Sequence, residues 1–139
     1  MTKPASQERP PNGDPAIRTL AMPADTNPNG DIFGGWLMSH MDVAGATVAI
    51  PRVGGRVVTV AVDAMTFLAP VYVGDVVSFY ASIERVGRTS IRVLVEAWSR
   101  RGRTGAEEKV TAGSFTYVAI DENRKPRVID PPPLDTAMA

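Results

Sequence analysis

The stretch from residue 32 to residue 50 constrains the fold of this chain more than any other part of the sequence. It is almost wholly apolar or small, and only Ser39, His40, Asp42 and Thr47 interrupt it with polar side chains. A helix that is apolar on most of its faces has to be largely enclosed by protein. Burying an ionisable group costs free energy unless the group is paired or used. The stretch therefore predicts a buried central helix in a small α+β domain, with Asp42 as its functional group.

Both ends of this helix are marked in the sequence. Asp31 is the expected N-cap, because its carboxylate can accept hydrogen bonds from the free N–H groups of Phe33 and Gly34. At the other end, Pro51 and the glycine pair behind it predict that the helix stops near Ile50.

Other segments carry the period-two pattern of β-strands. Short turns join the strands that follow the helix, and such an order predicts an antiparallel sheet of about five to six strands wrapped around the helix. A strand that is apolar at nearly every position, as 57–62 is, should be covered on both faces. The expected strands are 17–22, 57–62, 76–86, 89–100 and 107–120.

Proline clusters mark the two ends of the chain. Most of the 12 prolines lie close to one terminus or the other, and prolines resist incorporation into sheets and helices. We therefore expect an extended or disordered tail over 1–15, one domain over 16–127 and a proline-rich tail over 128–139.

A single sheet and a single helix leave one sheet face and the sheet edges open to water. Small proteins commonly cover such edges by pairing with a second copy. The architecture therefore predicts a dimer.

The composition excludes several classes of function. With 15 basic and 15 acidic residues the net charge is zero, so nothing indicates a nucleic acid or a membrane as partner. The chain has no cysteine and one histidine, which excludes a thiolate nucleophile and a His-rich metal site within one chain. Neither a signal-peptide core nor a membrane-spanning apolar run is present, so a cytoplasmic location is the default expectation.

One face of the predicted helix combines Asp42 with small residues. At 100° per residue, Gly35 and Asp42 differ by about 20° in direction, and Ala46 and Ala49 lie within about 40° of the same line. Such a stripe can serve close packing on a sheet, or it can leave room for a ligand beside the carboxylate. The N–H groups of the first turn carry positive partial charge and can stabilise a developing oxyanion. His40 points roughly 160° away from Asp42, so the two form no dyad on one helix.

Other polar residues have simpler interpretations. Asn27 and Asn29 are typical turn residues, and His40 is typical of a surface or an interface. Four arginines are typical of solvated strand ends, although arginines can also bind phosphates: Arg85, Arg88, Arg100 and Arg101.

Three segments together resemble a known family. They are RTLAMPADTNPNGDIFGGWLMSHMDVAGA, GRVVTVAVDAMTFLAPVYVGDVVSFYA and VGRTSI. They closely resemble the bacterial YciA-type acyl-CoA thioesterases of the hotdog-fold superfamily, and the similarity covers about residues 18–127. In this fold a curled antiparallel sheet wraps one long central helix.

The resemblance implies hydrolysis of acyl-CoA to a carboxylic acid and coenzyme A, without metal or cofactor. Asp42 would act as general base or as nucleophile. The Gly35 N–H would polarise the carbonyl from the other subunit of a dimer, and Asn27 or Asn29 would orient the water or the carbonyl. The expected CoA-path residues are Gly34, Thr59, Arg88, Thr89 and Ser90. Relatives commonly assemble further into hexamers.

Two other functions stay open beside this one. A hotdog hydratase or dehydratase would usually pair a histidine with an acid. A non-catalytic acyl-CoA sensor would normally carry a DNA-binding segment, for which the first 15 residues are too short. The C-terminal end departs from the family because it is short and proline-rich. If relatives use a longer C-terminal segment to shape the acyl pocket, the resemblance does not indicate which acyl chain this protein prefers.

Overall fold

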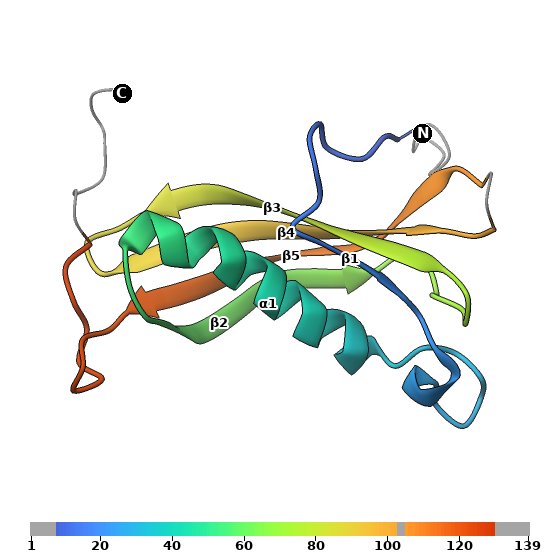
Figure 1. The fold of residues 1–139 in the computed structure, drawn as a ribbon, viewed down its shortest axis with the longest axis horizontal. Coiled ribbons are helices and arrows are strands. Elements are labelled where there is room, and N and C mark those ends of the chain that lie inside the picture. Colours follow the sequence, from blue (N-terminus) through green and yellow to red (C-terminus); the bar gives the residue numbers. More distant parts are fainter. Residues whose placement is uncertain (1–7, 103–104, 130–139) are drawn as a thin grey trace.

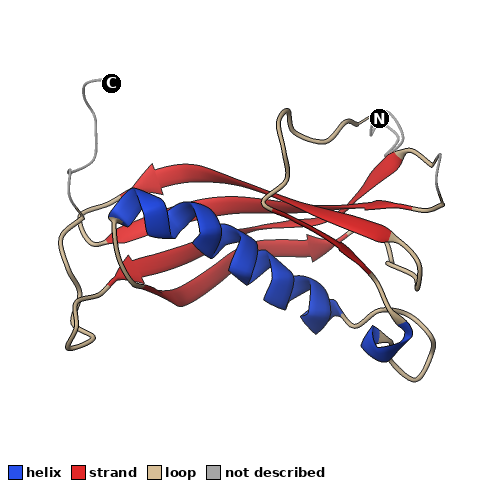
Figure 2. Cartoon of the chain, in the orientation of Figure 1, coloured by secondary structure: helices blue, strands red, loops and turns tan. Residues whose placement is uncertain are grey.

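A computed structural model describes residues 8–102 and 105–129 of the chain. One long helix lies across a single antiparallel sheet (Figures 1 and 2). In chain order the elements are β1 (Ile17–Leu20), the short 3₁₀ helix η2 (Pro23–Asp25), α1 (Gly34–Val53), β2 (Val57–Phe67), β3 (Val76–Val86), β4 (Ser90–Arg100) and β5 (Glu107–Ala119).

The sheet is open, with strand order β1-β3-β4-β5-β2 and every pair antiparallel. The strand after the helix crosses to the far edge, so β1 and β2 form the two edges and β4 lies at the centre. This arrangement confirms the predicted α+β class with one helix against an antiparallel sheet.

The core lies between α1 and the facing side of the sheet. Alternate residues of β4 point into it, as their period-two pattern predicts, and each is 0% exposed: Ile91, Val93, Val95 and Ala97. From the helix, Leu37, Met41, Ala44, Ala49 and Val53 pack against them. Burial of these apolar side chains is the main source of stability for a domain of this size.

The predicted N-cap is wrong, because α1 begins at Gly34 and its N-cap is Phe33, without a side-chain cap. The preceding loop closes on itself instead. The Asn27 side-chain oxygen accepts hydrogen bonds from the N–H groups of Asn29 and Asp31, at 2.9 and 3.1 Å. Asp31 is thus held by the loop before the helix starts, and the first turn of α1 stays uncapped.

The helix also ends later than predicted. It continues through Pro51 to Val53, and Gly54 ends it in the left-handed conformation with φ of 72°. Pro51 lies in the last turn and is exposed. There the missing N–H and the steric conflict with the preceding turn are tolerated more easily than in a helix interior.

In the described part of the single chain two expected coverings are absent, that of a largely enclosed α1 and that of both faces of strand 57–62. The outward side of α1 is uncovered, with Val43 55% exposed. Strand 57–62 is the beginning of edge strand β2, and Val60 is also 55% exposed. Both elements face the core on one side only, because one chain supplies one sheet and one helix.

The first strand stops at Leu20 rather than at 22, because η2 begins at Pro23. The described fold also continues beyond residue 127, since Ile129 is 0% exposed and donates its N–H to the Arg88 carbonyl. Residues 8–15 of the predicted N-terminal tail are described and form no helix or strand, whereas 1–7 and 130–139 lie outside the described residues. Within the described ranges, no helix is both long and apolar enough to cross a bilayer.

Candidate active site

Asp42 lies in the middle of α1 and reaches the edge strand. Thr59, near the start of β2, donates its hydroxyl hydrogen to Asp42 Oδ1 at 2.7 Å. The Asp42 side chain is half-buried. This hydrogen bond fixes the orientation of the carboxylate.

A second hydroxyl holds the backbone of the same residue. Tyr117 of β5 donates its phenolic hydrogen to the Asp42 carbonyl oxygen at 2.7 Å. Thr59 and Tyr117 are directly paired across the β2–β5 ladder, so one cross-strand pair holds Asp42 at two points. Gly45 makes this possible, because a Cβ at that position would collide with the Tyr117 hydroxyl.

Tyr117 keeps its proton at neutral pH. Burial, together with the negative charge of Asp42 and a hydrogen bond to it, raises the pKa of Tyr117 well above its usual value of 10.0. The residue is therefore a donor throughout the physiological range. The sequence did not identify Tyr117, because its position opposite Asp42 depends on the strand register.

The N-terminal turn of α1 is open. It carries no acidic residue and no side-chain cap, and nothing lies within 4 Å of the point where a Cβ of Gly35 would stand. The first N–H groups of a helix lack partners within the helix. This end of α1 can therefore receive an oxygen that becomes negative during a reaction.

A groove of about 420 Å³ adjoins this turn. Asn27, Asp31 and Gly34 form its polar part. The apolar lining residues are Ile32, Leu37, Phe67, Leu68, Ala69, Pro70 and Val71. The ring of Phe67 lies against Gly34, where an added Cβ would stand 3.3 Å from Cζ, so glycine at position 34 leaves room for this ring.

The structure separates the other predicted site residues. Asn29 donates its N–H to Asn27 and does not line the groove. The turn that contains Arg88, Thr89 and Ser90 lies beside the C-terminal end of α1 (Figure 1), whereas the groove adjoins the first turn of that helix. In it the Thr89 carbonyl accepts a hydrogen bond from the Ala119 N–H at 2.9 Å.

Gly35 and Asp42 do not converge on one reacting atom within a single chain. Seven residues of helix separate them by about 10 Å along the axis. His40 takes no part on this side, because its ring packs against Trp36 and Phe79, with centroids 4.6 and 5.5 Å apart.

A helix laid on an antiparallel sheet, with a mid-helix carboxylate and an open first turn, is the arrangement expected of the hotdog thioesterases that the sequence resembles. A profile described as thioesterase superfamily matches residues 29–106. The acyl-CoA thioester hydrolase YciA of Escherichia coli K12 is 53% identical over 122 residues, which cover 86% of this chain and 92% of the relative. The Salmonella typhimurium YciA is 54% identical over 120 residues, which cover 84% and 90%.

Solved structures give the same result. HI0827, a hexameric broad-specificity acyl-coenzyme A thioesterase, superposes with a TM-score of 0.81 at 50% identity, covering 87% of this chain and 84% of that one. The hexameric thioesterase y2039 of Yersinia pestis superposes with a TM-score of 0.81 at 55% identity, covering 86% and 97%. The chain belongs to the thioesterase superfamily and, within it, to the YciA-type acyl-CoA thioester hydrolases. The resemblance in the sequence is thereby confirmed.

Proposed function

We propose that this protein hydrolyses acyl-CoA thioesters with Asp42 as the catalytic carboxylate. The observation that carries the proposal is the contact between Thr59 and Asp42, 17 residues apart. An acyl-CoA hydrolase of Staphylococcus aureus, 28% identical with a TM-score of 0.76, was solved as an aspartate-to-alanine and as a threonine-to-alanine mutant. The two replaced positions of that enzyme are also 17 apart. This equal separation supports a joint role of the pair here.

The chemistry needs only a base and an oxyanion donor. A water oxygen attacks the thioester carbonyl carbon while Asp42 Oδ2 accepts the water proton. The C–S bond then breaks, and the sulfur of coenzyme A leaves and takes up a proton. In the covalent alternative, Asp42 attacks first and water hydrolyses the mixed anhydride. The Gly35 N–H stabilises the oxyanion in both cases.

The separation between Gly35 and Asp42 supports a site shared between two subunits. Each would contribute one group to a carbonyl bound at their interface, so a dimer is the smallest active unit. The hexameric assembly of HI0827 and y2039 supports a hexamer for this chain as well. Of the two candidate asparagines, Asn27 is favoured, because it lines the groove beside the oxyanion turn. Binding of CoA by Arg88, Thr89 and Ser90, and a cytoplasmic location, stay predictions.

Complementation between two inactive variants tests the shared site. Asp42→Ala removes the base, whereas Gly35→Pro removes the N–H donor and keeps a residue that the first helical turn tolerates. Each homo-oligomer should release almost no thiol from acyl-CoA. Random co-assembly should restore roughly a quarter of the wild-type activity, because half of the dimers are hybrids with one intact site of two. No recovery in verified hybrids would contradict the shared site.

A wild-type protein that releases no free CoA from any acyl-CoA would contradict the proposed function itself. The panel should run from acetyl-CoA to long saturated chains. A thiol-trapping assay measures the product directly.

A further inference from the structure

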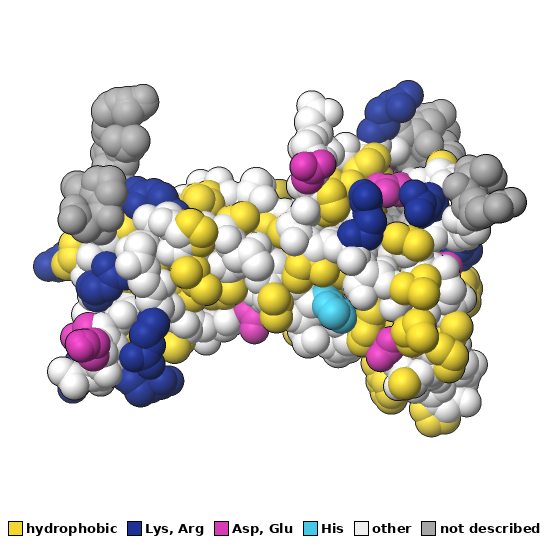
Figure 3. Space-filling view, in the orientation of Figure 1, with side chains coloured by type: hydrophobic (Ala, Val, Ile, Leu, Met, Phe, Trp, Pro, Cys, Tyr) yellow, Lys and Arg dark blue, Asp and Glu magenta, His cyan; other side chains and the backbone are white. Residues whose placement is uncertain are grey.

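The groove beside the first turn of α1 suits an acyl chain better than coenzyme A. Seven of its ten lining residues have apolar side chains, and the lining includes Asp31 but no Lys or Arg. The phosphates of CoA require cationic partners. Figure 3 shows Lys and Arg side chains at both ends of this face of the molecule, but none of them lines the groove. Under the proposed function, the acyl chain leaves the carbonyl bound at Gly35 along this groove.

One wall of the groove is a connecting segment, which we call the strap. It comprises residues 68–75 between β2 and β3. Leu68, Ala69, Pro70 and Val71 of the strap line the groove. Its backbone is tied to β5 by the Leu68 N–H, which donates to the Val110 carbonyl at 2.7 Å, and to the loop before α1 by the Val71 carbonyl, which accepts from Ile32 at 3.1 Å.

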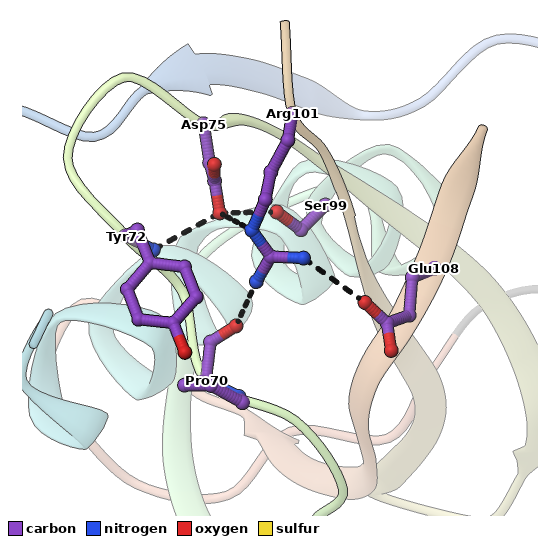
Figure 4. Close-up of polar contacts among 6 residues, drawn as sticks. All are labelled: Pro70, Tyr72, Asp75, Ser99, Arg101 and Glu108. Atoms are coloured by element: carbon purple, nitrogen blue, oxygen red, sulfur yellow. Dashed lines mark hydrogen bonds and ion pairs between the residues drawn. The ribbon is translucent and has the colours of Figure 1, made fainter. Parts of the chain in front are cut away.

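A buried carboxylate organises the end of the strap (Figure 4). The Asp75 side chain is only 4% exposed. Its Oδ2 accepts hydrogen bonds from the Tyr72 N–H at 2.9 Å and the Ser99 hydroxyl at 2.8 Å. The same oxygen lies 3.4 Å from Nε of Arg101, which supplies the opposite charge.

Arg101 then connects this carboxylate to the groove wall. Its Nη2 donates to the Pro70 carbonyl at 2.9 Å, and its Nη1 lies 3.2 Å from Glu108. The guanidinium also stacks over the Tyr72 ring, 4.5 Å from the centroid. Figure 4 shows it between these partners. A planar fork of five donors can satisfy such a set at once, whereas the ammonium group of lysine cannot.

We propose that Arg101 is a positioning residue that governs acyl-chain selectivity, by holding the Pro70 wall of the groove through its contacts with Asp75 and Pro70. The inference rests on the proposed function and adds a residue that does not touch the reacting atoms. It predicts an effect that depends on chain length. An acyl chain that is long enough to reach the Pro70 wall loses contacts with it when the strap is released. An acetyl group is too short to make those contacts and loses none.

Arg101→Gln tests the proposal, with Arg92→Gln as a matched control. Both arginine side chains are 42% exposed and both pair with two carboxylates, but Arg92 lies on the sheet away from the groove. We expect Arg101→Gln to lower kcat/KM roughly tenfold for the longest acyl-CoA that the wild type hydrolyses, the effect of losing contact with one or two methylene groups. The shortest substrate should change less than about twofold.

Arg101→Lys covers the case in which the glutamine variant fails to fold. Lysine keeps a positive charge beside Asp75 and loses the simultaneous contact with Pro70. We expect the same dependence on acyl-chain length, with a smaller decrease in kcat/KM. Equal losses for short and long substrates, or no loss in either variant, would overturn the proposal even if the wild type is fully active.

Hydrogen exchange gives a readout that does not depend on turnover. The Tyr72 amide should exchange faster in both Arg101 variants and at the wild-type rate in Arg92→Gln, because only the former release the strap. Unchanged exchange would overturn the holding role. A wild type without thioesterase activity would instead refute the proposed function, whatever the exchange rates are.

Discussion

Strands β4 and β2 have the same length of 11 residues, yet they differ in their hydrogen-bonded neighbours and in the burial of their side chains. β4 is hydrogen-bonded on both sides and its inward residues are fully buried. β2 is bonded only to β5, and Val60 in it is 55% exposed. Burial of a strand therefore follows from the number of its neighbours, and an apolar sequence shows only that the strand fits a covered surface.

The two strands also differ in regularity and in function. β2 changes register after Thr59 and again after Asp63, and Ala64 adopts a positive φ of 56°. The partner of Asp42 lies on this irregular edge, whereas β4 supplies core side chains. The central strand supplies the core, and the edge strand supplies Thr59, which holds the proposed catalytic carboxylate.

Truncation in β4 should have the largest effect on stability. Ile91→Ala should lower the free energy of unfolding by about 2–5 kcal/mol, because it leaves a cavity in a closely packed core. Val60→Ala in β2 is the control and should cost less than about 1 kcal/mol in the single chain. Denaturant unfolding measures both. An equal loss would show that assembly buries β2 as deeply as the chain buries β4.

Asp42→Ala should produce the largest loss of activity without a matching loss of stability. Removal of a catalytic base should lower kcat at least about a hundredfold. The half-buried side chain should contribute little to the melting temperature. Steady-state thiol release and thermal unfolding measure the two effects. Activity within about threefold of the wild type would exclude Asp42 from the mechanism.

Thr59→Ala tests whether the edge strand takes part in the reaction. Loss of a hydrogen bond to a charged carboxylate should lower kcat roughly tenfold, and Thr59→Ser should recover most of it, because the hydroxyl is retained. KM should change little in either variant. If alanine and serine behave alike, the hydroxyl has no catalytic role.

Tyr117→Phe should change the dependence of stability on pH. The folded-state pKa of Tyr117 is raised above 10.0, so its unfolded form releases the proton first. The wild type should therefore lose stability as the pH rises above 10.0. The phenylalanine variant lacks this contribution, so the difference in melting temperature between the two proteins should shrink there. Parallel curves would show that Tyr117 is not buried and hydrogen-bonded as described.

Ala64→Gly should have the smallest effect. Relief of the positive φ in β2 should stabilise the domain by at most about 1 kcal/mol, because glycine also gains entropy in the unfolded state. Ala64→Val should destabilise it, since a branched side chain fits this conformation poorly. A thermal shift assay with both variants distinguishes the backbone effect from a change in packing.

Local patterns predicted the elements because their signals are local. The alternating pattern from Val76 to Val86 predicted β3 with its observed bounds. The apolar run predicted α1 to within three residues at each end. The N-cap prediction was wrong because α1 begins at Gly34, three residues after Asp31, and Asp31 belongs to the preceding loop, where its N–H bonds the Asn27 side chain.

The candidate site was less accessible to sequence reasoning. Asp42 was recognisable as an acid in an apolar helix. Tyr117 and the pairing of Thr59 with Asp42 depend on which residues of β2 and β5 face each other. Bulges in β2 shift that register, and no periodic pattern reports a bulge. The role of Arg101 depends on three segments that meet only in the folded chain.

Under the proposed function, the open first turn of α1 has a consequence for the product as well as for the transition state. No acidic side chain occupies this positive end of the helix, whereas the Arg127 guanidinium binds the Val53 carbonyl at the negative end, at 2.9 Å. The carboxylic acid released by hydrolysis is ionised at neutral pH and presents an anion to the same N–H groups. Each turnover therefore generates a competitor for the next substrate molecule, and we expect inhibition that grows with the concentration of free acid and is relieved as the acid is removed.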